Sequence, residues 1–327
     1  MKTSMLNRRS FLAGVSAASV IPLHKATAET PLTLWGPPAA PSVVLAQAVA
    51  SGALKGLNTA VAFKVWRTPD EMRAGLSSGT MQAVIVPTNV AANLYNRGLG
   101  VHLVNAMTRG LLYIVAKEEV KSLKDLASKK VAVPFRSDMP DFIMRRLLAR
   151  AGMKIGTDIH IDYAGTPPEA MQMLVAGRFD AALLSEPGAT AAILRAKLGL
   201  THFTRAIDCQ KEWAQVVGGN GFIPQAGLAV TRAFIDRFGA TGLRTLQAAL
   251  QEAVQYVIAH PLRASVASAS EFGMMSPIVA EAIPHSNLAA LPASSIRADL
   301  EKFFTILSED DPRIIGGKLP DAAFYAL

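Results

Sequence analysis

The sequence has little cysteine, no metal-binding motif and no long apolar run, and each absence narrows the class of protein. Cys209 is the only cysteine among 327 residues, which excludes an internal disulfide. The six histidines form no His-x-x-x-His pair, so neither a metal nor another cofactor is predicted. After residue 28, no uninterrupted apolar run reaches about 18 residues, the length that a membrane-spanning helix needs. We therefore expect a soluble mature chain that folds by packing alone.

Patterns for catalysis and for nucleic-acid binding are missing as well. The chain has no Gly-x-Ser-x-Gly elbow and no Walker loop, so no catalytic residue is predicted. It also has no Lys/Arg block with interleaved aromatic residues, so nucleic acid is not an expected partner. Residues 1–28 hold four of the 33 basic residues and no acidic ones. The mature chain therefore has a net charge of 29 − 25 = +4. This small excess favours an anionic ligand only weakly.

The first 28 residues have the pattern of an export signal. Arg8 and Arg9 precede an apolar stretch over residues 11–23, and Ala-Thr-Ala follows at 26–28. This order predicts cleavage before Glu29 and a periplasmic location. The adjacent arginines resemble the twin-arginine motif, whose cargo is exported folded; an ordinary secretory signal with two arginines is the alternative.

A pattern that begins at Thr68 returns at Thr166, 166 − 68 = 98 positions later. Each copy reads Thr-Pro-x-Glu, followed by leucine, glycine, alanine and an aliphatic residue at the same spacing. Thr-x-x-Glu is a capping box with proline at the first helical position, and the glycine predicts the end of the helix. An alternating run then predicts a strand. The repeat predicts two similar α/β lobes with a cleft between them.

The chain is also expected to cross twice between these lobes. Gly-led extended runs at 110–115 and 227–230 have the pattern of two crossover strands. They divide the mature chain into a first lobe of residues 29–110 plus 226–327 and an inserted second lobe of 111–225. Strands that alternate with helices predict mainly parallel sheets. In such sheets, ligands bind at the carboxyl ends of strands.

Three predicted helices have clear roles in packing. Residues 243–257 and 296–307 carry apolar stripes that predict core faces. A helix from Pro140 to Ala151 places Arg145, Arg146 and Arg150 toward its C-terminal half, where they complement the helix dipole. We expect these three arginines to be solvated.

Several segments together resemble a known family. They are Ser122–Leu126 followed by Lys129–Val133, Gly177–Ala182 followed by Glu186-Pro187, Ala259-His260-Pro261, and Gly317–Pro320 with Phe324-Tyr325. By their order and spacing, the mature chain resembles the nitrate/sulfonate/taurine class of ABC-transporter solute-binding proteins, which have the type II periplasmic binding fold. The resemblance implies two lobes that close on a small solute and then dock on a membrane permease. It does not carry over a particular solute.

The expected ligand contacts are four strand-end loops, at residues 35–39, 87–89, 135–138 and 185–187. The third has an anion-binding pattern. Arg136 and Ser137 lie between a strand and a helix N-terminus, where backbone N–H groups and the helix dipole favour an anion. They are predicted to hold an acidic or polar end of the ligand. In the alternative, Arg136 is solvated, and Ser137 or Asp138 caps the helix.

The other loops supply the remaining candidates. Trp35 and Pro37 predict an apolar wall against a planar ligand. Polar side chains at strand ends and near the first crossover are candidates for hydrogen bonds to the ligand: Thr88, Asn89, Thr108, Arg109 and Glu186. Capping or a tie at the hinge is the alternative for several of these.

The sequence thus predicts an exported, monomeric, non-enzymatic protein that captures a small organic ligand and delivers it to an ABC permease. Arg136 favours an anion such as a sulfonate or a nitrate-like ion, while Glu186 favours an amine. A zwitterion or an aminopyrimidine-like compound satisfies both. Two other functions stay open: an enzyme on the same fold in vitamin or quinone metabolism, and a ligand-sensing partner of a membrane receptor.

Overall fold

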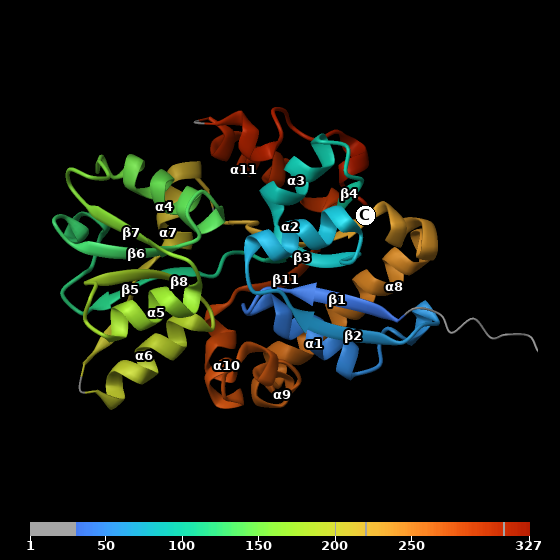
Figure 1. The fold of residues 1–327 in the computed structure, drawn as a ribbon, viewed down its shortest axis with the longest axis horizontal. Helices are drawn as coiled ribbons and strands as arrows, with labels where there is room; N and C mark the ends of the chain where they lie inside the picture. The colour runs from blue at the N-terminus through green and yellow to red at the C-terminus, as the bar shows by residue number, and fades with distance from the viewer. Residues whose placement is uncertain (1–30, 200, 220, 310) are drawn as a thin grey trace, which may run out of the picture. The chain divides into compact units, whose positions relative to one another are not determined.

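Two mixed β-sheets, each covered by helices, organise the chain from Pro31 onward in the computed structural model (Figure 1). Residues 31–199, 201–219, 221–309 and 311–327 are described; the predicted export signal and its cleavage site lie outside them. The first sheet has the order β2-β1-β3-β10-β4-β11 and the second β7-β6-β8-β5-β9. The strands are β1 Leu32–Gly36, β2 Val61–Val65, β3 Ala83–Pro87, β4 Val101–Thr108, β5 Leu112–Lys117, β6 Lys130–Pro134, β7 His160–Ala164, β8 Ala181–Ser185, β9 Phe203–Asp208, β10 Ala226–Thr231 and β11 Leu288–Pro292.

The helices follow the strands as the sequence pattern predicts. The α-helices are α1 Pro41–Ala50, α2 Pro69–Ser78, α3 Thr88–Asn96, α4 Met139–Arg150, α5 Pro167–Val175, α6 Gly188–Leu198, α7 Cys209–Val217, α8 Arg232–Ala259, α9 Pro261–Phe272, α10 Ser276–Ala282 and α11 Arg297–Ser308. Short 3-10 helices are η1 Lys55–Leu57, η2 Leu123–Leu126, η3 Ile283–His285, η4 Ser294–Ile296, η5 Pro312–Ile315 and η6 Ala322–Phe324. None of the described helices is both long and apolar enough to span a bilayer.

The repeated sequence pattern forms the same capped unit twice. The Thr68 hydroxyl accepts a hydrogen bond from the Glu71 N–H at 3.2 Å, and Thr166 accepts one from Glu169 at 3.3 Å. Both glutamate carboxylates reach back to the N–H of the residue before the cap, at 2.7 Å in each copy. The strands on either side of each helix, together with β1 or β6, take matching places: β2-β1-β3 corresponds to β7-β6-β8. The two sheets are therefore built on one plan.

The two crossover runs become β5 and β10, which hold equivalent places beside β8 and β3. Parallel pairing, which was expected to dominate, is confined to the three repeat strands of each sheet. Both crossover strands are antiparallel to both of their neighbours. The physical reason is how the chain enters each crossover strand. Parallel neighbours need a connection, usually a helix, that returns the chain to the end of the sheet where the previous strand began. A strand that arrives directly from the other sheet has no such connection.

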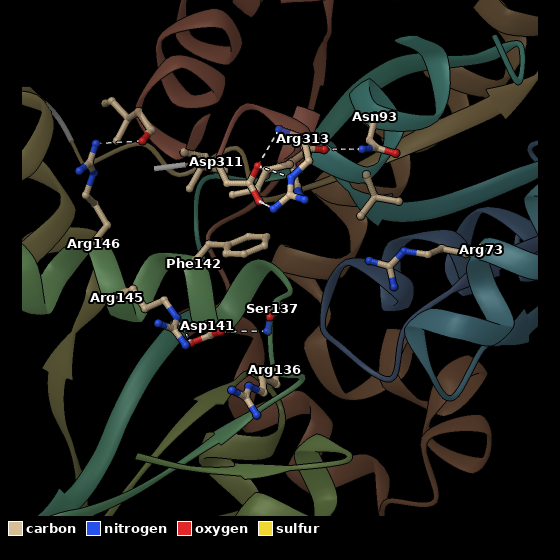
Figure 2. A pocket seen from close by; sticks show the side chains of 15 residues that line it. Arg73, Asn93, Arg136, Ser137, Asp141, Phe142, Arg145, Arg146, Asp311 and Arg313 are labelled. Carbon is tan, nitrogen blue, oxygen red and sulfur yellow. Dashed lines mark hydrogen bonds and ion pairs between the residues drawn. The ribbon is translucent and has the colours of Figure 1, made fainter. Parts of the chain in front are cut away.

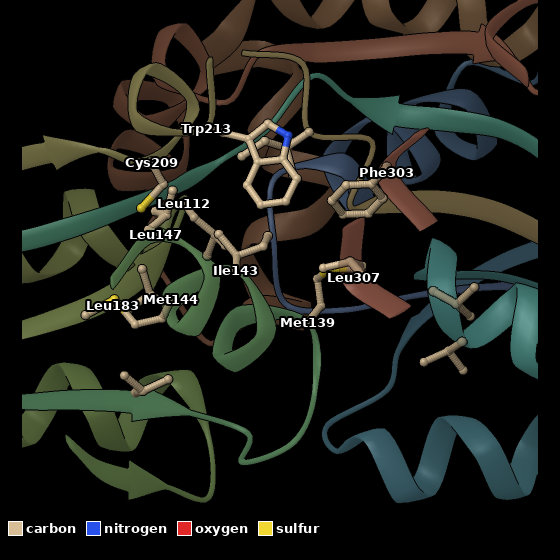
Figure 3. Packing of buried hydrophobic residues seen from close by; sticks show 14 of the residues in the cluster. Leu112, Met139, Ile143, Met144, Leu147, Leu183, Cys209, Trp213, Phe303 and Leu307 are labelled. Carbon is tan, nitrogen blue, oxygen red and sulfur yellow. The ribbon is translucent and has the colours of Figure 1, made fainter. Parts of the chain in front are cut away.

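The predicted apolar stripes lie in the core. Leu243, Leu246 and Leu250 of α8 are buried, and α11 buries Phe303 and Phe304 against the other side of the first sheet. One apolar cluster extends from α11 onto α4 and α7, which belong to the second sheet (Figure 3). This cluster packs the helices of one sheet directly against those of the other.

Candidate ligand-binding site

All four strand-end loops that were expected to contact the ligand contribute to one small cavity of about 90 Å³ between the sheets. We call it the inner cavity. Pro37 follows β1 and Pro87 ends β3 on the side of the first sheet. Phe135 follows β6 and Ser185 ends β8 on the side of the second. The carboxyl ends of equivalent strands therefore face each other, which is where open α/β sheets bind ligands.

The inner cavity has apolar and aromatic walls with few polar groups. The Trp66 ring belongs to the wall and is held in place because its Nε1–H donates to the Ile85 carbonyl at 2.9 Å. Gln225, only 7% exposed, lines the same cavity, and its Oε1 is buried without a hydrogen-bond partner among the described residues. Buried polar atoms are normally paired, so this unpartnered oxygen at the wall is a candidate acceptor for a donor on a ligand.

The loop from Phe135 to Asp138 is strained at two residues. Phe135 and Ser137 have φ of 60° and 58°, a region that non-glycine side chains rarely adopt. The loop is held by the Phe135 N–H, which donates to the Ala164 carbonyl at 3.0 Å, and by the Ser137 N–H, which donates to Asp141 at 2.9 Å. Strain of this kind is concentrated at functional loops.

Asp138 begins α4, as the capping interpretation predicted. Its carboxylate accepts a hydrogen bond from the Met139 N–H at 2.8 Å. It also pairs with Arg73 of α2 at 2.7 Å, an ion pair that joins the helices of the two sheets. One carboxylate thus caps a helix and links the two halves of the molecule.

A second and larger cavity of about 620 Å³ opens beside the inner one, and five arginines line it (Figure 2). We call it the arginine cavity. Its guanidinium groups come from α2, from the loop before α4, from α4 itself and from η5. The arginines are Arg73, Arg136, Arg145, Arg146 and Arg313. Asp138 lines the inner cavity and Arg73 the arginine cavity, so their ion pair lies between the two spaces.

Carboxylates pair with four of these arginines. Arg145 Nε donates to Asp141 at 2.8 Å, and Arg313 Nε donates to Asp311 at 2.9 Å. The Arg313 hydrogen bond lowers the pKa of the Asp311 carboxyl. Arg146 pairs with Glu309 of α11, and Arg73 pairs with Asp138 as described above.

Arg136 differs from the other four. Its guanidinium lies 5.3 Å from the centre of the Tyr163 ring, and in the described part of the chain it has no carboxylate partner. Burial, followed by the nearby Asp141 carboxylate, raises the pKa of Tyr163, so this ring stays neutral beneath the cation. A neutral ring attracts the guanidinium through its π-face and leaves the N–H donors unused.

The residues expected to contact the ligand are divided between the two cavities. Pro37 lines the inner cavity. Asn89, Arg136 and Ser137 line the arginine cavity. Arg136 and Ser137, the expected anion contacts, therefore lie beside the inner cavity, on the other side of the Arg73–Asp138 pair.

Three expected polar contacts are occupied by protein groups and line neither cavity. The Thr88 hydroxyl donates to the Pro224 carbonyl at 2.6 Å, and the Thr108 hydroxyl donates to the Ser286 carbonyl at 2.9 Å. The buried Glu186 carboxylate accepts hydrogen bonds from the Thr190 hydroxyl at 2.8 Å and from Arg205 Nε at 2.6 Å.

Arg109 and Trp35 also lie away from both cavities. Arg109 stands over the Phe222 ring at 5.4 Å, and its N–H donates to the Asn287 carbonyl at 2.8 Å, which ties the crossover to the C-terminal segment. Trp35 packs on the core beside Lys64, its partner on β2. The aromatic wall that was expected from Trp35 is supplied by Trp66.

Sequence reasoning missed several lining residues and misjudged one arginine. Arg145 is exposed, as predicted, but it also lines the arginine cavity. Arg146 was expected to be solvated and is half-buried, because it donates to the Ile306 carbonyl of the C-terminal segment. Arg150 is exposed, as predicted. Trp66 directly follows β2, so its position at the carboxyl end of a strand could have predicted a ligand contact. Gln225 directly precedes a crossover strand, a position that predicts no such contact.

No group of three or more His, Cys, Asp or Glu side chains is placed to hold a metal ion in the described ranges. Cys209 is buried, and burial raises the pKa of its thiol. A thiol in that state is a poor nucleophile.

The fold is similar to that of several solved structures. An ABC-transporter protein from Parabacteroides distasonis aligns with a TM-score of 0.73 and 23% identity over 90% of this chain and 98% of that one. The periplasmic aliphatic sulphonate-binding protein of Escherichia coli aligns with a TM-score of 0.68 and 18% identity over 88% and 94%. The periplasmic nitrate-binding protein of Synechocystis aligns with a TM-score of 0.61 and 14% identity over 77% and 69%.

These similarities define the architecture as the two-lobed fold of type II periplasmic binding proteins. Residues 68–270 match the NMT1-like family, and because this match covers more than half of the chain, the protein belongs to the NMT1-like family. No curated protein matches the chain.

Proposed function

We propose that the protein is an exported solute-binding protein, which captures a small organic ligand in the inner cavity and delivers it to an ABC permease. The observation that carries the proposal is the convergence of all four strand-end loops, two from each sheet, on one cavity. A ligand there contacts both halves of the molecule at once, so its binding favours the closed arrangement. The relatives with this fold include periplasmic proteins that bind sulphonate and nitrate.

The chemistry of the inner cavity favours a small planar ligand with a hydrogen-bond donor. Trp66 and Phe135 line the cavity with aromatic side chains, which suit a planar body, and Gln225 adds an unpaired acceptor. The lining contains no Lys, Arg or His, so this space favours a neutral, amine-bearing ring over a sulfonate or a nitrate-like ion. An aminopyrimidine-like compound meets both conditions.

The proposal extends to the organisation and location of the protein. We place the first lobe at residues 29–110 plus 226–327 and the second at 111–225, because the crossover strands begin at these boundaries. Export by the twin-arginine signal, cleavage before Glu29 and release of a monomer into the periplasm complete the proposal. We propose no catalytic role. The one carboxylate of the lining, Asp138, is paired with Arg73 and the Met139 N–H, and the lining has no histidine, lysine or cysteine to act with Ser185.

Mass spectrometry of ligand released from the purified native protein tests this function. We expect a stoichiometric small molecule with a planar body and an N–H or O–H donor. Gln225→Leu should reduce the amount retained, because it removes the unpaired acceptor. Gln82→Leu is the matched control, since Gln82 also has a buried unpaired Oε1 but lies outside the inner cavity. Equal retention by the two variants, or conversion of the released compound by the protein, would count against the proposal.

A further inference from the structure

The arginine cavity has cationic groups on opposing walls. Figure 2 shows Arg73 on one side and Arg136 with Arg145 on the other, with Arg313 above them. Arg73 and Arg313 belong to elements that pack on the first sheet, while Arg136 and Arg145 belong to the second. An anion with a single oxyanion group reaches one wall, whereas an anion with several groups reaches both.

Donors remain available in the cavity despite the internal ion pairs. Each guanidinium carries five N–H donors in a planar fork, and a carboxylate uses at most two of them. Arg136 lies over the Tyr163 ring and pairs with no carboxylate of the described residues, so its N–H groups are open to an anion. The Arg313 side chain is 90% exposed in its pair with Asp311. Exposed ion pairs contribute little to stability, so an incoming anion competes readily with Asp311 for Arg313.

One of the five guanidinium groups has no carboxylate partner in the described chain. Arg73 pairs with Asp138 at 2.7 Å and, at 3.9 Å, with the fully exposed Asp70. Arg145, Arg146 and Arg313 pair with Asp141, Glu309 and Asp311. The unpaired cation is Arg136.

The size and position of the cavity decide what fits. At about 620 Å³ it is far larger than the space that one oxyanion group occupies, since a water molecule takes about 30 Å³ of liquid volume. The Arg73–Asp138 pair lies between this cavity and the inner one. The walls of the arginine cavity come from α2, α3, the loop before α4, α4, α11 and η5, and a hollow formed by several elements suits a small molecule better than a flat protein surface.

We infer that the arginine cavity is a second binding site, distinct from the inner cavity, for a small anion that carries several oxyanion groups. Polyphosphates and polycarboxylates share this chemistry. Because the ligand contacts elements of both sheets, its binding stabilises the closed arrangement of the protein independently of the solute in the inner cavity.

Calorimetric titration of the purified mature protein with tripolyphosphate, and separately with citrate, tests the inference and distinguishes the two sources of the anion. We expect one site per chain for at least one of the two anions and an affinity that falls as salt rises. Arg136→Gln removes the unpaired cation and should weaken binding by about tenfold, as for the loss of a charge-assisted hydrogen bond. The exposed position of Arg136 makes misfolding of the variant an unlikely cause of such a loss.

Arg150→Gln is the matched control, because it removes the same charge from an exposed position on α4 outside the cavity. It should bind both anions like the unchanged protein. Failure of the unchanged protein to bind either anion would overturn the inference, and so would equal losses in both variants. Binding of a polyglutamate peptide with no binding of either small anion would overturn it in favour of an acidic partner. Gln225→Leu should leave anion binding intact, which separates this test from that of the proposed function.

Discussion

Single side chains in this protein show how a partner decides the role of a charged residue. Glu186 lies in a strand-end loop, where the sequence predicts a carboxylate that accepts a hydrogen bond from an amine on the ligand. In the fold, its side chain is fully buried and is satisfied by Thr190 and Arg205. A buried carboxylate with these partners stabilises the loop in place and is not available to a ligand.

Removing the partner of Glu186 should therefore be costly. Arg205→Met leaves a buried carboxylate without its cation, and we expect a loss of about 3 kcal/mol in the free energy of unfolding. Urea denaturation measures this loss. Arg232→Met is the control, since the exposed Arg232–Asp236 pair contributes at most about 1 kcal/mol. Similar losses in the two variants would contradict the role assigned to Arg205.

At the scale of secondary structure, the repeated pattern was the most informative feature of the chain. Its threonine caps, first-turn prolines and glutamates all act within one turn of a helix, so they predict local structure well. Both copies form the same helix and then the same strand. The mixed pairing of the sheets was not predicted, because it depends on where the two crossover strands arrive from.

The two caps should have similar effects on stability. Thr68→Ala and Thr166→Ala each remove one hydrogen bond to an N–H of the first turn, and each should lower the free energy of unfolding by about 1 kcal/mol. Thr305→Ala is the control, because Thr305 lies exposed inside α11, where alanine is the better helix former. If Thr305→Ala were the most destabilising of the three, capping would not be the cause.

The helices of the two sheets are joined by an aromatic contact between α7 and α11. The Trp213 and Phe303 rings lie 5.5 Å apart at 68°, and both side chains are almost fully buried (Figure 3). Phe303→Ala should cost about 3–5 kcal/mol, the range for an aromatic residue removed from a core. Leu198→Ala, at an 88% exposed position, should change stability by less than about 0.5 kcal/mol. Thermal denaturation of both variants checks this prediction.

At the scale of the whole molecule, polar ties between the two sheets cluster around the cavities. Arg73 of α2 pairs with Asp138 at the start of α4, and Arg146 of α4 donates to the Ile306 carbonyl of α11 at 2.9 Å. These contacts can form only when the two halves are close. If the protein closes as proposed above, these contacts belong to the closed arrangement and contribute to its stability.

Loss of the Arg73–Asp138 pair should shift the protein toward an open arrangement. We expect Arg73→Met to increase the radius of gyration of the ligand-free protein in small-angle scattering, and addition of the released ligand should reverse part of the change. Arg67→Met is the control, because Arg67 is exposed just before the same helix and pairs with no residue of the second sheet in the described structure. A radius of gyration that is equal in all three proteins would argue against closure.

The amino-acid sequence by itself determined the elements and their order. Caps, first-turn prolines, apolar stripes and a 98-residue repeat all act over short stretches of chain, so they predicted two similar lobes, two crossovers and the four loops that meet in the inner cavity. Only the tertiary structure decided which side chains face a ligand. Trp66 and Gln225 line one cavity although they are 225 − 66 = 159 positions apart in the sequence. The Arg73–Asp138 pair separates Arg136 and Ser137, the expected anion contacts, from the apolar inner cavity. The physical reason is that a side chain's role depends on its partners, and distant partners come together only by packing.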